Sequence, residues 1–452
     1  MTQELRTAQE LLALRGEGAS LDGAQLTDLD LTGLDLAGIA LPRASFTRCK
    51  LAGARLEGAN LEGAIFVETS LRGARLRGAR LVGARLAGAD LDEAQLDQAD
   101  LSSADLTGAL MRRASLADAI LRGATLRWAV LERALLPRAD LRGASLGGAS
   151  FKQATLTRAD LRELVHGAPD LSGADLSSVD LTGSTLLGAR LVGVDLARAR
   201  CAGCDLTGAD LTEATLHEAD LAGASLKGAR LRGASLPGLT LDGCDLSGAD
   251  LTGADLDGVD LRKTNLAGVV LERCSLRRAK AAGVRLQGCF MKDADFMEAD
   301  LERACLDEGD VRQASFARAT MKGATLWKVQ GQAADFSGAD LTEADLRGSD
   351  LATAQLYGAV ARKACFDLCK LARSILEGAD LRGASFVAAD LRYALLDRAQ
   401  LDLADMSDCD LEAASLHRIT DTGCRLAGAN LKSVRRTDAA RARAEDFEPG
   451  RE

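Results

Sequence analysis

Residues 89–108 read ADLDEAQLDQADLSSADLTG, four pentads in a row that each carry a leucine two residues after an alanine. A period of five matches neither the 3.6 residues of a helical turn nor the alternation of a strand. One small and one large inward residue in every five require a chain that turns a corner in each repeat. Each pentad then supplies one short side of a coil.

The register of this pattern holds along almost the whole chain. From Leu21 to Leu431 every fifth residue is Leu, Phe or Met, with few exceptions. Glycine is frequent two residues later, where a turn with positive φ costs it nothing sterically. We expect a bulge or an enlarged coil at three of the exceptions, His166, Gly331 and Asp421. The others are Cys201, Ala281, Val311 and Ala361.

The spacing of the phenylalanines indicates that four pentads close one coil. Phe296, Phe316 and Phe336 follow one another at intervals of 20 residues. Such spacing stacks the rings on neighbouring coils along one face. Coils of about 20 residues predict an all-β solenoid of roughly 21 coils, on the order of 100 Å long at about 4.8 Å per coil.

The pentads also carry a recurrent motif, A-(D/N)-L-x-x, as in Ala59-Asn60-Leu61 and Ala249-Asp250-Leu251. In this motif the chain resembles the pentapeptide-repeat family over about nine tenths of its length. The resemblance implies a right-handed quadrilateral β-helix. It implies little about activity, because this fold is a general support on which different sites can be built.

Three segments are expected along the chain. Residues 1–20 carry apolar residues at helical spacing, including Leu5 and Leu11. They form a short helical cap over the open end of the column, which would otherwise expose its backbone edge. Residues 21–434 form the β-helix. Residues 435–452 are a polar tail, helical or disordered, so the C-terminal end of the column is the less protected one.

The composition excludes several classes of function. The net charge is −10, and charged residues make up 27% of the chain. They are mixed along it without a sustained basic stripe, which argues against direct nucleic-acid binding. No apolar run approaches the length of a membrane span, and residues 1–18 lack the apolar stretch of a signal peptide. We expect a cytoplasmic protein without membrane contact, which agrees with free thiols in a reducing compartment.

Catalytic and metal sites are not predicted. His217 and His417 are 200 residues apart, so they cannot join in a triad. Cys201 and Cys204 both fall on inward positions, which favours core packing over metal binding. The glycines recur as turn residues and never form a phosphate loop. The sequence therefore predicts a protein that is not an enzyme and has no cofactor.

One predicted face carries a column of carboxylates just before the large residue. Aspartate and asparagine are common at that position because they bond to the turn backbone. The column also matches a branch of the family whose members resemble DNA and bind type II topoisomerases such as gyrase. This acidic ladder comprises Asp140, Asp160, Asp180, Asp220, Asp260, Asp300, Asp340 and Asp380.

Outward positions occupied by apolar residues are the second surface feature. Pairs that stack one coil apart make patches, and patches indicate partners. The alternative is that irregular coils turn these side chains inward. The candidates are Leu110, Trp128 and Val130 in one group and Tyr357, Ile375, Tyr393 and Leu395 in another.

These observations predict a non-catalytic scaffold that binds protein partners in a bacterial cytoplasm, with DNA mimicry toward gyrase as the alternative. The first repeats, from Leu29 to Leu36, also resemble those of pentapeptide-repeat proteins found with contractile, type VI-like secretion machinery. We expect any homodimer to form through the C-terminal end, where an exposed edge lies close to apolar side chains.

Overall fold

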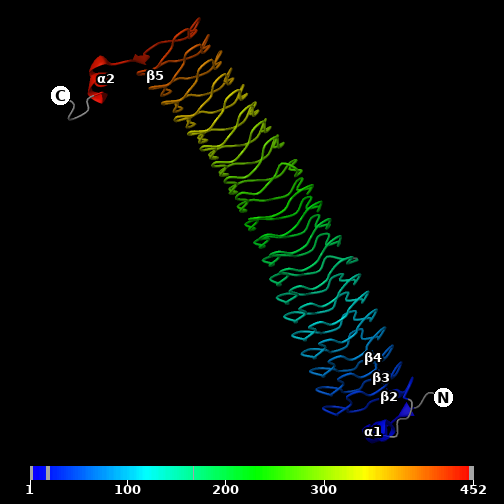
Figure 1. Cartoon of the computed structure of the whole chain (residues 1–452). Coiled ribbons are helices and arrows are strands. Elements are labelled where there is room, and N and C mark those ends of the chain that lie inside the picture. Colours follow the sequence, from blue (N-terminus) through cyan, green and yellow to red (C-terminus); the bar gives the residue numbers. More distant parts are fainter. Residues whose placement is uncertain (1–3, 17–20, 166, 447–452) are drawn as a thin grey trace. The chain divides into compact units, whose positions relative to one another are not determined.

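The structure is a computed structural model, and it describes residues 4–16, 21–165 and 167–446. Contacts divide the chain into two compact units, Met1–Ser235 and Leu236–Glu452. Within each unit the chain winds through successive stacked coils (Figure 1).

The first unit shows directly that a coil has four sides and 20 residues. Parallel bridges join residues that are 20 positions apart, at four places in most turns of the chain. In one coil Asp90, Gln95, Asp100 and Asp105 pair with Leu110, Ser115, Ile120 and Thr125 of the next. The quadrilateral arrangement predicted from the pentads is confirmed.

Few of these pairings extend into strands, because a pentad turns again after each bridge. The regular elements of the first unit are β1 (Glu4–Leu5), α1 (Ala8–Gly16), β2 (Gln25–Thr27), β3 (Ser45–Thr47) and β4 (Ile65–Val67). The four short strands form one parallel sheet in the order β1-β2-β3-β4.

The helix α1 begins with a reciprocal pair of side-chain bonds. The backbone N–H of Glu10 donates to Thr7 Oγ1 at 3.2 Å, and the N–H of Thr7 donates to Glu10 Oε2 at 3.3 Å. This capping box satisfies two amides that the helix itself leaves unpaired. Leu11 is fully buried, and Leu5 on β1 is 3% exposed, so both predicted apolar positions face protein.

The second unit follows the same plan. It contains β5 (Ser415–Leu416), β6 (Arg435–Arg436) and α2 (Ala439–Glu445), and β5 pairs with β6 in parallel. Phe316 stacks between Phe296 and Phe336 with ring centroids 5.0 Å apart on both sides. The stacking expected from the 20-residue spacing is confirmed.

The turn between sides requires a positive φ two residues after the large position. Residues other than glycine adopt it as well, as Glu93 (φ 62°) and Tyr393 (φ 61°) show. The amide of Glu93 then donates to Arg112 O at 2.8 Å. This bond to the next coil offsets the backbone strain of a left-handed residue.

The irregular positions are accommodated without bulges where the structure describes them. A Cβ on Gly331 would lie 2.8 Å from Leu351 Cδ2 and 3.3 Å from Val311 Cγ2, so neighbouring side chains fill the place of a leucine. The amide of Gly331 still donates to Asp350 O at 2.8 Å, and the expected bulge is wrong. Asp421 is exposed in the final coil, between regular bridges. His166 lies outside the described residues.

The final coil leaves large side chains partly uncovered. Leu431 is 39% exposed, and Leu426 and Val434 are half-buried. Helix α2 has no buried residue of its own. Among the described residues, the last coil therefore exposes part of its large side chains, and the prediction that this end is the less protected one stays a prediction.

Cys201 and Cys204 lie in the core of the first unit. The thiols of Cys201 and Cys204 are each 1% exposed, and the Sγ of Cys204 donates to Leu181 O at 2.7 Å, so their assignment to the core is confirmed. No helix in the described part of the chain has the length and apolar content of a membrane span.

Candidate functional site

The predicted C-terminal apolar residues lie on one face and its two flanking turns. Parallel bridges join Gln355 to Ile375 and Ile375 to Leu395 in consecutive coils. Tyr393 occupies the turn that leads into Leu395, and Tyr357 occupies the turn that follows Gln355. We call Tyr357, Ile375, Tyr393 and Leu395 the C-terminal apolar patch.

These side chains are exposed to different degrees. Tyr357 is 59% exposed, Tyr393 53% and Leu395 36%, whereas Ile375 is half-buried. The Arg373 guanidinium lies 5.7 Å from the ring centre of Tyr393. Such a contact orients the ring without covering it. The patch is thus a set of ordered apolar groups beside a cation.

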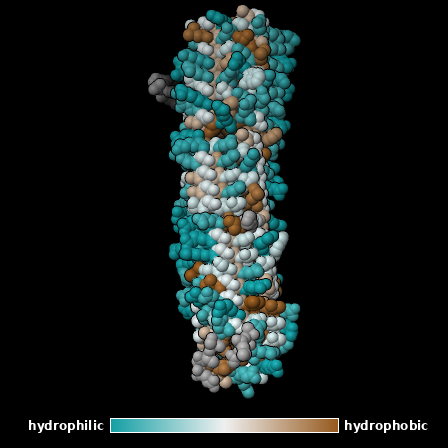
Figure 2. Space-filling view, turned by 90° about the vertical axis from the view of Figure 1, so that its right-hand side faces the viewer, coloured by the Kyte–Doolittle hydropathy of each residue, from teal (hydrophilic) through white to brown (hydrophobic). Residues whose placement is uncertain are grey.

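The second predicted group lies in the first unit. Leu110 and Val130 pair across neighbouring coils, and both are half-buried. Trp128, in the turn before Val130, is 64% exposed. Its ring lies on the backbone of Gly148, where a Cβ would meet it at 2.3 Å. Figure 2 shows that polar side chains cover much of the visible face, while apolar ones form small separate groups.

The acidic ladder has a structural role at every position. Each of its aspartates accepts the backbone N–H of the residue two positions later, from Arg142 on Asp140 to Arg382 on Asp380. This bond closes the turn. The explanation of the column as turn-forming residues is therefore confirmed.

Arginines also neutralise much of the ladder. Asp380 receives two hydrogen bonds from Arg382, at 2.8 and 2.7 Å, and a third from Arg362 Nε at 2.6 Å. Asp160 and Asp260 are paired in the same way with the arginines two residues later. Within each unit, ion pairs therefore interrupt the row of carboxylates.

Hydrogen bonds from these arginines lower the pKa of Asp160, Asp260 and Asp380. The hydrogen bond from Arg382, helped by Arg362 and opposed by burial, lowers the pKa of Asp380 to about 2. A carboxyl group with a depressed folded-state pKa contributes stability above its unfolded pKa. That stability disappears as the pH falls through the folded value.

We therefore predict a pH-dependent effect of Asp380→Asn, which keeps the turn acceptor but removes the charge. At pH 7 the variant should be less stable by on the order of 2 kcal/mol. The difference should shrink between pH 4 and pH 2, measured by urea unfolding across that range. Asp300→Asn, at an exposed position of the same column, is the control. A difference at Asp380 that stays constant with pH would contradict the assignment.

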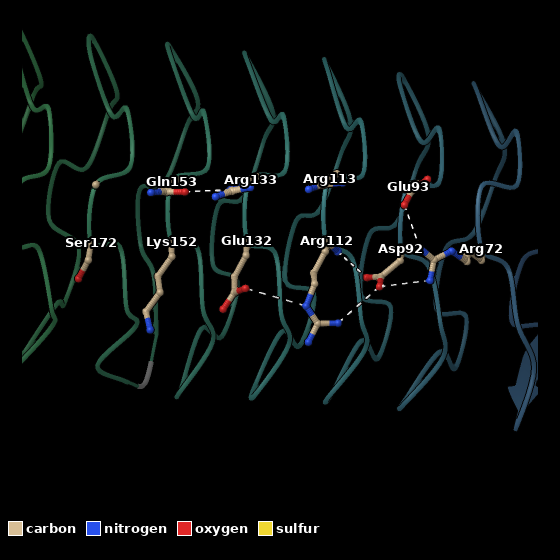
Figure 3. Close-up of a pocket in the computed structure, with 11 residues that line it drawn as sticks. Arg72, Asp92, Glu93, Arg112, Arg113, Glu132, Arg133, Lys152, Gln153 and Ser172 are labelled. Atoms are coloured by element: carbon tan, nitrogen blue, oxygen red, sulfur yellow. Dashed lines mark hydrogen bonds and ion pairs between the residues drawn. The ribbon is translucent and has the colours of Figure 1, made fainter.

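A groove in the first unit was not predicted from the sequence. Its volume is about 570 Å³, and its lining includes Arg72, Asp92, Arg112, Glu132 and Lys152 (Figure 3). Asp92 is 9% exposed and accepts the N–H of Arg112 at 2.8 Å. The five positions are 20 residues apart and alternate in sign, which is the signal that could have revealed the groove.

A second unpredicted cluster surrounds His417 in the second unit. This residue is 2% exposed and contacts Glu445 of helix α2. The sequence analysis assigned no contact to His417 and left the tail as helical or disordered. Among the described residues, no group of three or more His, Cys, Asp or Glu side chains is arranged to hold a metal ion.

Comparison with known proteins gives one strong match. The family model described as "Pentapeptide repeats (8 copies)" matches thirteen overlapping segments that together span residues 44–164, 168–326 and 334–418. No curated protein matched the chain.

Solved structures that match the chain include two that are described as pentapeptide-repeat proteins. HetL of the cyanobacterium Nostoc, described as involved in heterocyst differentiation regulation, is 28% identical and aligns over 61% of this chain and 97% of its own, with a TM-score of 0.24. A thylakoid lumen protein of Arabidopsis thaliana is 24% identical over 27% and 69%, with a TM-score of 0.18. QnrB1, a plasmid-mediated fluoroquinolone resistance protein, is 18% identical over 54% and 91%, with a TM-score of 0.22. With TM-scores this low, the superpositions carry no argument about function.

Proposed function

The chain belongs to the pentapeptide-repeat family, and from that premise we propose that it is a non-catalytic scaffold that binds a protein partner through the C-terminal apolar patch. The observation that carries the proposal is the exposure of Tyr357, Tyr393 and Leu395 on one face and its turns. Aromatic and aliphatic groups held on a rigid backbone lose little conformational entropy when they are buried. They are the residue types on which interfaces depend most.

The ion pairs of the acidic ladder favour this scaffold over DNA mimicry. A mimic has to present free negative charge, as the phosphates of DNA do. Here Asp160, Asp260 and Asp380 are each engaged by at least one arginine. Attraction between the ladder and a basic DNA-binding surface is correspondingly weaker.

The proposal includes a setting for the scaffold. The protein acts in a bacterial cytoplasm, and the likeness of its first repeats to those of proteins from contractile secretion systems suggests where a partner can be sought. Residues 4–16 act as the N-terminal cap, since β1 pairs with β2 and Leu11 is buried. A second copy of the chain is a further expected partner, because Leu431 is uncovered at the other end.

We predict that Ile375→Glu combined with Leu395→Glu weakens partner binding by at least about 10-fold. The reason is that two apolar contacts are replaced by charges that the interface must desolvate. The free energy of unfolding should change by less than about 1 kcal/mol, because these side chains are not in the core. Affinity capture from the native cell measures the binding of another protein, and light scattering at several concentrations measures the formation of a homodimer.

The control is Phe290→Glu combined with Leu368→Glu, which changes two exposed residues of the same unit outside the patch. It should leave binding unchanged. Partner capture that survives the Ile375 and Leu395 double substitution would remove the patch as the binding surface. Light scattering that shows a monomer at all concentrations would rule out the homodimer, but it would not affect the proposal that another protein binds the patch.

A further inference from the structure

The carboxylate of Glu445 is held by several donors at the end of helix α2. Its Oε2 accepts from Arg398 Nη2 at 2.9 Å, from His417 Nε2 at 3.3 Å and from Arg418 Nη1 at 3.4 Å. Its Oε1 accepts from Arg441 Nε at 2.9 Å. Three of these donors belong to the coils and only Arg441 belongs to the helix. We call Arg398, His417 and Arg418 the carboxylate pocket.

Bonds within the coils, together with one bond from Asp438 at the start of helix α2, position His417 and the backbone of Arg398. The amide of Arg398 donates to His417 O at 2.7 Å, and the amide of His417 donates to Asp397 Oδ1 at 3.2 Å. The N–H of Asp438 donates to His417 Nδ1 at 3.3 Å. That bond places the imidazole proton on Nε2, which points at the carboxylate. The coils therefore fix the backbone that carries Arg398 and His417, while the guanidinium groups of Arg398 and Arg418 are held by Glu445 and Asp446.

The occupant is held much less firmly than the pocket. Helix α2 has seven residues and no buried side chain, and isolated helices of this length are unstable in water. Besides Glu445, its contacts with the coils include Arg441 to Asp397 at 3.2 Å and Asp446 to Arg418. Each pair joins an exposed group of the helix to a partly buried group of the coils, and ion pairs that reach the surface contribute only modestly to stability.

The pocket adjoins the C-terminal apolar patch. Leu395 precedes Arg398 by three residues in the same coil and pairs with Ser415 of the next. Tyr357 belongs to the same column of turns as His417, since the amides of Gly338, Gly358, Gly378 and Arg398 donate in succession to Tyr357, Glu377, Asp397 and His417. A polypeptide lying across the patch would reach the pocket.

We propose that the carboxylate pocket receives an acidic side chain of the protein partner, and that Glu445 occupies it in the free protein as an internal competitor. The inference rests on the proposed function, since the partner is the protein that binds the apolar patch. The chain's own occupant identifies the chemistry: a carboxylate on a flexible polar segment. Two guanidinium groups and a neutral imidazole match it in charge and in hydrogen bonds. Asp397 does not compete with Glu445 for the donors of the pocket, because its Oδ1 already accepts hydrogen bonds from Ser415 Oγ and from the amide of His417.

The test uses the full-length chain and a labelled peptide of residues 437–446 as the probe. In the wild-type protein the tethered Glu445 fills the pocket at a high effective concentration, so the peptide should bind weakly. Glu445→Gln removes this competitor and should strengthen peptide binding by about 10-fold or more, measured by fluorescence anisotropy. Hydrogen exchange of residues 439–445 should become faster in the same variant.

Three controls make the result specific. A peptide with Gln in place of Glu445 should bind the opened variant at least about 10-fold more weakly. Adding Arg398→Gln and Arg418→Gln should abolish binding of the original peptide. Glu412→Gln, which removes a carboxylate paired with Lys432, should behave as the wild type.

The proposal for the carboxylate pocket would be overturned if the two peptides bound equally well, or if Glu445→Gln did not strengthen peptide binding. Unchanged exchange of α2 in that variant would overturn the role of Glu445 as its anchor. The proposed function fails separately, if partner capture survives the loss of Ile375 and Leu395.

Discussion

Replacing Leu251 by aspartate is expected to destabilise the second unit by several kcal/mol. Leu251 is fully buried, and its amide donates to Val270 O at 2.9 Å. The core is a narrow column of leucine and alanine, so a carboxylate at this position meets no polar partner and no water. The group must be protonated or the coil must open, and both cost free energy.

The matched control is Leu368→Asp, the same substitution at a side chain that is 66% exposed. It should change the free energy of unfolding by less than about 0.5 kcal/mol. Urea unfolding followed by circular dichroism compares the two variants with the wild type. An unchanged transition for Leu251→Asp would mean that this position does not face the core.

Replacing Phe316 by alanine should have the second largest effect, a loss of about 3–5 kcal/mol. Its ring is fully buried between those of Phe296 and Phe336. Truncation removes two stacked contacts and leaves a cavity that the coils above and below cannot close, because their backbones are held apart by the parallel ladder.

Two further variants test that explanation by the same unfolding measurement. Phe316→Leu restores the residue usual at this position and should recover most of the loss. Phe290→Ala removes a ring that is 52% exposed and should cost less than the buried truncation. Equal losses of stability in Phe316→Ala and Phe290→Ala would show that ring stacking inside the column does not stabilise the fold.

The candidate surfaces were predictable where they depend on one column of residues. Ile375 and Leu395 are 20 positions apart. This interval stacks phenylalanines in the core, and it also stacks these two side chains on the outer face of the coils. The groove around Asp92 could have been predicted in the same way, because the signs of its charged residues alternate at intervals of 20 residues. The surroundings of His417 were not, because their partner Glu445 lies beyond the last repeat, where no period relates one residue to another.

The sequence by itself determined the coil: the pentad sets where the chain turns, and the 20-residue interval sets which side chains stack. This is so because each inward residue contacts the equivalent residue of the next coil, which makes the fold a property of local spacing. Only the tertiary structure decided how the surface charges pair and where the tail rests. Those contacts depend on side-chain reach and on the return of α2 to the coils, and Asp380 with Arg362 and Glu445 with Arg398 are the clearest cases.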